Sequence, residues 1–143
     1  MKILPEMRDV SLKEKRDSDI YRLYLRGLEA TEFTSLSGAA KYVCRHPAPC
    51  FYITAKQANL QIGKILSNIS LIALSSKTRA KIWRLYDNYV QYMKDHPDCR
   101  EPRQSVLDIL VEQEAPEFYL DTQRVRKILK KEVNKRRRKW MDM

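Results

Sequence analysis

Residues 46–54 read HPAPCFYIT, and residues 113–121 read QEAPEFYLD. Each stretch contains Ala-Pro-any-Phe-Tyr, followed by an aliphatic residue and then by a residue suited to begin a helix. Proline lacks the N–H that a helix interior needs, and it biases the residue before it towards an extended backbone. Each stretch therefore predicts a break between two helices and a short extended apolar segment, too short to be assigned as a strand.

The similarity continues on both sides of these stretches. Residues 20–24 (IYRLY) resemble residues 82–86 (IWRLY) at an offset of 62, whereas the Ala-Pro-any-Phe-Tyr phrases are offset by 67. One five-residue gap near residues 95–99 (DHPDC) reconciles the two offsets. Two matches in the same order favour an internal duplication. The predicted organisation is an N-terminal lead-in (1–11), a first helical unit (12–66), a connector (67–73), a second helical unit (74–133) and a basic C-terminal extension (134–143).

Within each unit, apolar residues recur at helical spacing. The stripes of the first unit are Ile20, Leu23, Tyr24 and Leu28, then Leu36, Ala39, Ala40 and Val43, and then Ala58, Ile62, Ile65 and Leu66. Those of the second are Ile82, Tyr86, Tyr89, Val90 and Met93, then Val106, Leu107, Leu110 and Val111, and then Val125, Ile128, Leu129 and Val133. The predicted fold is all-α: two pseudo-repeated three-helix units (helix, helix, Pro-aromatic corner, helix) packed as one body, with a basic C-terminal helix.

The same local structure is predicted for the two corners. We expect Phe51 and Phe118 to fill the gap between the helices that flank each corner. Thr54 is a good N-cap, and Gln57 three residues later completes a capping box. Asp121 is the equivalent cap in the second unit. Each corner should therefore fix the direction in which the third helix leaves.

Positive charge is concentrated at one end of the chain. The chain has 28 basic and 18 acidic residues, a net charge of +10. Residues 124–139 contain ten basic residues and a single acid, Glu132. The basic residues are Arg124, Arg126, Lys127, Lys130, Lys131, Lys135, Arg136, Arg137, Arg138 and Lys139. The remainder is almost neutral, so the chain reads as a neutral body with one cationic helix that needs an anionic partner or ample water.

The basic helix predicts a nucleic-acid-binding protein. Its apolar stripe belongs in the core, so its cations should point outward and contact phosphates. The plan is loosely helix-turn-helix-like, although the corner is longer than the usual turn of that motif. DNA is favoured over RNA as the partner, and Gln123, Arg124, Arg126 and Asn134 are the candidates for base contacts. The alternatives are a solvated helix face or an acidic protein partner.

No catalytic or cofactor motif accompanies this helix, and we expect no enzyme activity, cofactor or metal. The set Cys44, Cys50, His96 and Cys99 lacks the paired spacing of a zinc site, although the sequence leaves metal binding by it open. An odd number of cysteines in a chain without an apolar signal-peptide core predicts reduced thiols and a cytoplasmic location. No apolar run is long enough to span a membrane, and the narrow apolar face of the basic helix disfavours binding on one.

Tyrosine is frequent, with eight residues in the chain. Six lie beside the apolar stripes: Tyr21, Tyr24, Tyr42, Tyr86, Tyr89 and Tyr92. Because they follow the helical period, we favour a core role with the hydroxyls reaching water. The alternative is stacking on unpaired bases.

The phrases APEFYL, SVLDILVEQ and RRRKW resemble a group of small basic bacterial proteins from prophages and mobile elements, whose function is not established. Members of that group tend to carry a basic residue between Pro and Phe, where this chain has Cys50 and Glu117. The resemblance implies a phage or mobile-element context, and together with the basic helix it predicts a DNA-binding accessory or regulatory protein. The alternatives are a structural or assembly component of a phage particle, which would place it in the virion and against phage structural proteins, and an RNA-binding factor. The oligomeric state is left open.

Overall fold

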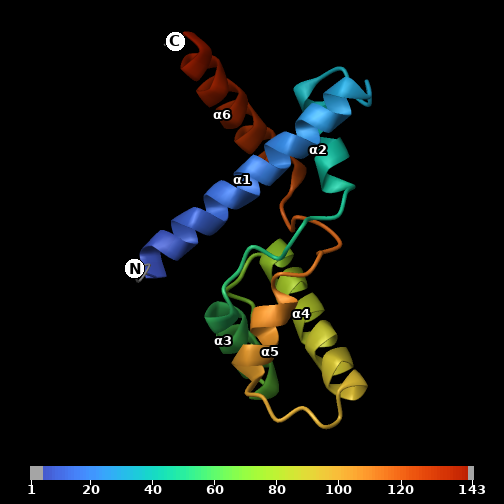
Figure 1. Ribbon diagram of the computed structural model, residues 1–143, viewed down its shortest axis with the longest axis vertical. Helices are drawn as coiled ribbons and strands as arrows, with labels where there is room; N and C mark the ends of the chain where they lie inside the picture. The colour runs from blue at the N-terminus through green and yellow to red at the C-terminus, as the bar shows by residue number, and fades with distance from the viewer. Residues whose placement is uncertain (1–4, 142–143) are drawn as a thin grey trace. The chain divides into compact units, whose positions relative to one another are not determined.

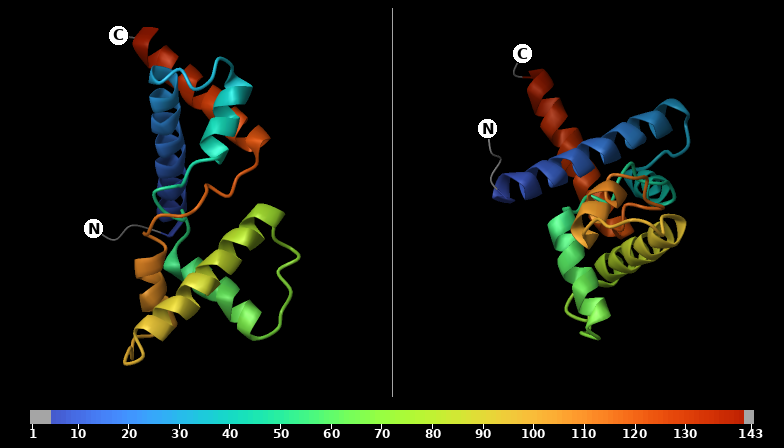
Figure 2. Two further views of the ribbon diagram at one scale, coloured as in Figure 1. Left: turned by 90° about the vertical axis from the view of Figure 1, so that its right-hand side faces the viewer. Right: turned by 60° about the horizontal axis from the view of Figure 1, so that its bottom comes forward.

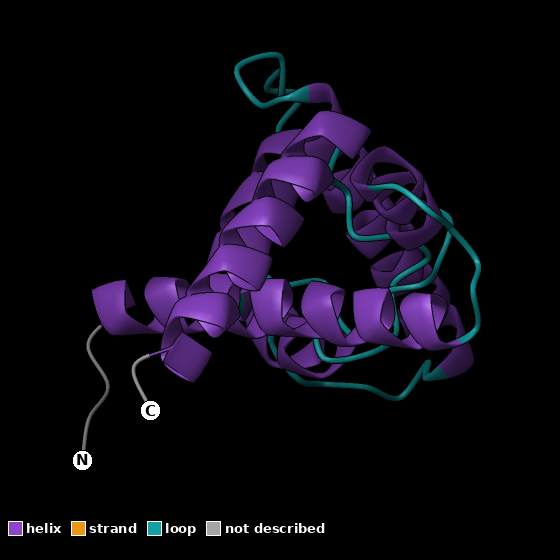
Figure 3. Ribbon diagram, turned by 90° about the horizontal axis from the view of Figure 1, so that it is seen from above, coloured by secondary structure: helices purple, strands orange, loops and turns teal. Residues whose placement is uncertain are grey.

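The computed structural model describes residues 5–141, and the surroundings of side chains for residues 12–138. This part of the chain contains helices and no strand, which confirms the all-α fold class (Figures 1 and 3). The helices are α1 (Pro5–Glu29), α2 (Leu36–Cys44), α3 (Ala55–Leu66), α4 (Ser76–Asp95), α5 (Arg103–Leu110) and α6 (Thr122–Met141).

Two helices extend beyond the predicted units. α1 begins at Pro5, inside the segment expected as a lead-in. α6 continues to Met141, so the segment 134–143 expected as a separate extension is, up to that residue, the same helix. Arg136, Arg137 and Arg138 therefore lie on the same continuous helix as the α6 residues that pack in the core.

The chain divides into two compact units, and the division cuts across the sequence units. The terminal unit comprises Met1–Ala48 and Pro116–Met143 and therefore contains α1, α2 and α6. The central unit, Pro49–Ala115, contains α3, α4 and α5. Each compact unit thus combines the first two helices of one sequence unit with the third helix of the other. The boundary between the compact units lies inside the two Ala-Pro-any-Phe-Tyr phrases rather than at the predicted connector.

The core of the terminal unit is built around α2. Ala39 and Ala40 are small and fully buried, so α6 can approach α2 closely, and it also packs on α1 (Figures 1 and 2). The other buried hydrophobic residues of this core include Ile20, Val43, Phe118, Val125, Ile128 and Leu129. Leu28, expected to continue the stripe of α1, is instead 43% exposed.

The central unit buries Phe51 of the first corner and residues of all three of its helices, among them Ala58, Ile62, Ile82, Leu85, Val106, Leu107 and Leu110. Two sequence assignments are corrected here. Leu66 is 52% exposed because it ends α3. On α4, Ile82 and Leu85 are buried, whereas Tyr86, Tyr89, Val90 and Met93 are only half-buried. The buried face of α4 is therefore centred on different residues from those expected.

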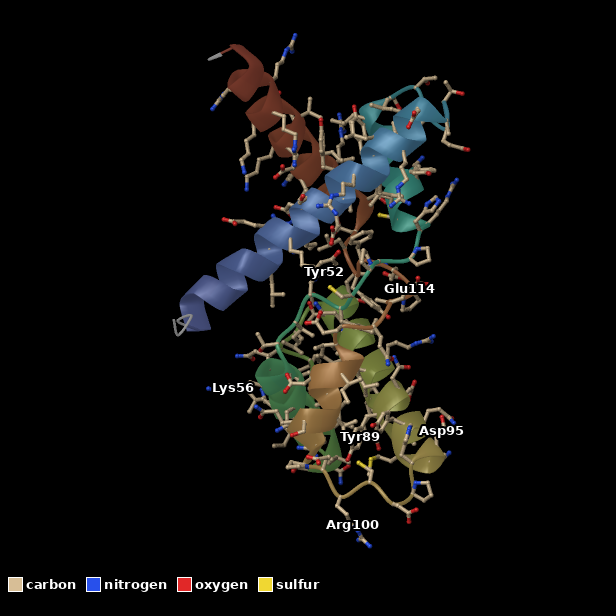
Figure 4. All side chains as sticks on the ribbon, in the orientation of Figure 1. Tyr52, Lys56, Tyr89, Asp95, Arg100 and Glu114 are labelled. Carbon is tan, nitrogen blue, oxygen red and sulfur yellow. The ribbon has the colours of Figure 1, made fainter. Side chains whose placement is uncertain are left out.

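Both corners contain a tyrosine with a left-handed backbone. Tyr52 has φ 52° and Tyr119 has φ 57°, so the extended conformation expected for the two phrases is wrong at these positions (Figure 4 labels Tyr52). A non-glycine residue in this region costs about 1–2 kcal/mol. Burial of the preceding phenylalanine, Phe51 or Phe118, offsets that cost. The Phe51 N–H also donates to the Val111 carbonyl (3.0 Å), which ties the first corner to the end of α5.

The predicted helix caps are confirmed. Thr54 Oγ1 accepts a hydrogen bond from the Gln57 N–H (3.1 Å) at the start of α3. Asp121 Oδ1 accepts one from the Arg124 N–H (2.7 Å) at the start of α6. Each cap satisfies a backbone donor that a helix start otherwise leaves without a partner.

Candidate nucleic-acid interface

The buried stripe of α6 determines which of its residues reach solvent. Val125, Ile128 and Leu129 are at most 4% exposed, and Val133 is half-buried one turn later. Glu132 is also buried, at 6% exposed, and most of the other described positions of the helix are exposed. The predicted cations at these positions are all exposed: Arg124, Arg126, Lys127, Lys130, Lys131, Lys135, Arg136, Arg137 and Arg138. Lys139 belongs to α6 by its backbone, but its side chain lies outside the described residues.

Part of this cationic surface is hollowed. Gln123, Arg126, Lys127 and Lys130 line a depression of about 260 Å³. Their spacing of three, four and seven residues places them on one face of α6. Three cations on one face of a helix can contact neighbouring phosphates together.

Arg136 differs from the other cations of α6 because it also contacts groups of its own unit. Its Nε lies 3.8 Å from Oε2 of Glu132, and its guanidinium carbon lies 4.1 Å from the centre of the Tyr21 ring on α1. The Glu132 side chain is only 7% exposed, whereas that of Arg136 is 45% exposed. Arg136 therefore anchors α6 against α1 as well as contributing charge. Sequence reasoning missed this role: the spacing of four residues between Glu132 and Arg136 was a signal for their ion pair but not for the contact with Tyr21.

The residues expected to contact bases are all on the exposed side of α6 or at its start. Gln123 and Arg126 line the depression, and Asn134 lies one turn beyond Lys130 on the same face. Arg124 gives its backbone N–H to the Asp121 cap, and the residue is exposed. The structure thus brings Gln123, Arg126 and Asn134 onto one face.

The two histidines each contact a backbone carbonyl and a tyrosine ring of the helix that precedes them. His46 Nδ1 lies 2.6 Å from the Tyr42 carbonyl oxygen, and His96 Nδ1 lies 2.9 Å from that of Tyr92. In both pairs the ring centres are 4.1 Å apart, an arrangement that the repeated Tyr-x3-His-Pro sequence could have revealed. The cysteines are present as thiols. Among the described residues, no three His, Cys, Asp or Glu side chains lie together in a way that could hold a metal ion.

The helices described within residues 5–141 include none that is both long and apolar enough to cross a lipid bilayer.

Comparison with known proteins gives no relative: no protein-family model, curated protein or solved structure matches this chain significantly.

Proposed function

We propose that this protein binds nucleic acid through α6, with DNA favoured over RNA. The observation that carries the proposal is the exposure of nine cations on one helix whose opposite face is held in a core. Three of those cations line a single depression, and a polyanion is the partner that such a surface fits. Contacts to the phosphate backbone supply the affinity, and Gln123, Arg126 and Asn134 are placed to contact bases.

An accessory or regulatory role in a phage or mobile element is part of the proposal, and it rests on the resemblance of the APEFYL and RRRKW phrases. The internal duplication belongs to it as well. In support, Tyr52 and Tyr119 occupy the same place in the two phrases and share the left-handed backbone conformation. Each phrase also leads to a helix whose first turn is capped by a side chain, Thr54 or Asp121.

The decisive experiment neutralises the cations of the depression. We compare the wild-type chain with the triple variant Arg126→Gln, Lys127→Gln, Lys130→Gln, using the fluorescence anisotropy of a labelled oligonucleotide between about 50 and 200 mM salt. Because each phosphate contact adds about 0.9 to the slope of log K against log salt concentration for duplex DNA, the variant's slope should be smaller by about 2.7. Over this range the wild-type affinity should fall about 40-fold more than that of the variant.

A matched control separates a local site from general charge. The triple variant Lys56→Gln, Arg84→Gln, Lys94→Gln removes the same charge from exposed positions of the central unit. It should keep a slope close to that of the wild type. Equal slopes for the wild type and both variants, or no binding by the wild type, would refute the assignment of α6 as the interface.

A further inference from the structure

A continuous series of aromatic rings runs along the terminal unit. The ring centres of Tyr21 and Tyr24 are 5.8 Å apart, those of Tyr24 and Phe33 are 5.6 Å apart, and those of Phe33 and Tyr42 are 5.5 Å apart. The series ends at His46, whose ring centre is 4.1 Å from that of Tyr42. We call these five residues the aromatic ladder. It joins α1 to α2 through the turn between them.

The aromatic ladder lies at the surface rather than in the core. All five of its residues are half-buried, unlike the corner residues Phe51 and Phe118, which are at most 5% exposed. On α1, Leu25 and Leu28 are 44% and 43% exposed, and they follow Tyr21 at helical spacing of four and seven residues. One face of α1 therefore presents aromatic and aliphatic side chains to solvent next to its buried face. A tyrosine confined to the core would not have this environment.

This apolar surface adjoins the cationic one. The Arg136 guanidinium of α6 lies 4.1 Å from the centre of the Tyr21 ring, which is the first member of the ladder. Both surfaces belong to the terminal unit. A ligand that contacts Arg136 therefore lies next to Tyr21, whose neighbour in the ladder is Tyr24.

The combination of cationic and aromatic side chains on this surface distinguishes single-stranded from double-stranded nucleic acid as the ligand. A duplex keeps its base faces stacked inside, so it offers phosphates to α6 and nothing that an aromatic ring can stack on. A single strand offers both phosphates and exposed base faces, and non-specific single-strand binders combine a cationic track with aromatic platforms. We infer that the ligand of α6 is single-stranded nucleic acid, whose bases stack on the faces of Tyr21 and Tyr24 opposite to those that Arg136 and Phe33 cover. This inference rests on the proposed function and narrows its ligand.

The other end of the ladder has a packing role. A Cβ at Gly27 would clash with Phe33 and lie 2.9 Å from Cε1 of Tyr42, so these two rings close directly over the glycine. Substitution there would disturb the turn between α1 and α2. The test therefore uses Tyr21, which contacts Arg136 of α6, and its neighbour Tyr24, neither of which is among the groups that meet a Cβ at Gly27.

The experiment uses the full chain and two labelled probes of equal length, a thymine oligonucleotide and a mixed-sequence duplex. Affinity is measured by fluorescence anisotropy at one salt concentration. The wild type should bind the single strand at least about tenfold more tightly than the duplex. The double variant Tyr21→Leu, Tyr24→Leu should lose roughly 5- to 150-fold in single-strand affinity for each base that no longer stacks, with duplex affinity unchanged.

Two further variants make the result specific. Tyr24→Phe keeps the ring and should keep the single-strand affinity. Tyr86→Leu, Tyr89→Leu removes two half-buried tyrosines from α4 in the central unit and should leave both affinities unchanged.

The outcomes separate this inference from the proposed function. If both probes bind but equally well, and the Tyr21 and Tyr24 substitutions change neither affinity, the single-strand inference is overturned while nucleic-acid binding stands. An equal loss on both probes also overturns it, because such a loss reports damage to α6 rather than lost stacking. If neither probe binds, the proposed function itself fails.

Discussion

Replacing Leu129 by alanine should destabilise the terminal unit and leave the central unit intact. Leu129 lies on α6 and is fully buried, so truncation removes core packing that no neighbour can replace without rearrangement. A change of this kind costs about 2–5 kcal/mol. Taking about 3 kcal/mol, the equilibrium constant for opening of the unit should rise by roughly 100-fold.

Hydrogen–deuterium exchange of the full chain, read by peptide mass spectrometry, locates the effect. In the Leu129→Ala variant, amides of α1, α2 and α6 should exchange faster, because these helices share one core. Amides of α3, α4 and α5 should exchange at the wild-type rate. The end of α2 precedes Leu129 by more than 80 residues, whereas the end of α5 precedes it by fewer than 20. The effect should therefore follow the shared core rather than closeness in the sequence.

A mirror variant supplies the control. Leu107 lies on α5 and is also fully buried, so Leu107→Ala makes a similar cavity in the central unit. It should accelerate exchange in α3 and α4 and spare α1, α2 and α6. The reasoning is refuted if Leu129→Ala speeds exchange in α4 and α5 while α1 and α2 stay protected. That result would mean that α6 packs within its own sequence unit.

Two further pairs of substitutions test local features by thermal or chemical unfolding. Gly27→Ala should lower the free energy of unfolding by about 1–3 kcal/mol because the added methyl group meets Phe33. In Gly63→Ala the added methyl group meets only the end of the Arg103 side chain, so this substitution should be neutral or stabilising. Equal effects at the two glycines would contradict the tight contact at Gly27. Thr54→Ala and Asp121→Ala should each cost about 1 kcal/mol by removing a helix cap, and an unchanged free energy of unfolding in both would show that these caps are unimportant.

The parts of the fold that the sequence revealed are local. Pro47 prevents α2 from continuing far beyond its end at Cys44, and Thr54 and Asp121 begin the next helices by hydrogen bonds within one turn. Pro116 does not end α5, which already stops at Leu110. The buried stripe of α6 could be found for the same reason, since helical spacing fixes which side chains share a face. Because the cations lie on the opposite side of that helix, their exposure to solvent could be predicted as well.

The features that the sequence did not reveal depend on long-range packing or on backbone conformation. The period of α4 suggested Tyr86 and Tyr89 as core residues, but Leu85 is buried instead, because the position of neighbouring helices decides which edge of a stripe is covered. The left-handed backbone at Tyr52 and Tyr119 is unusual for a tyrosine, so residue preference argued against it. The contact of Arg136 with Tyr21 joins residues 115 positions apart, and neither residue signals the other.

The exchange of third helices has a physical basis in the corners. The segments between α2 and α3 and between α5 and α6 contain ten and eleven residues, longer than a tight turn that would fold a helix back on its own pair. Each segment also contains a tyrosine whose left-handed backbone redirects the chain. The apolar stripes of α3 and α6 are similar enough that composition alone does not choose between α2 and α5 as the partner. We infer that the direction imposed by the corner contributes to this choice; α6 packs on α2, whose buried residues are Ala39, Ala40 and Val43.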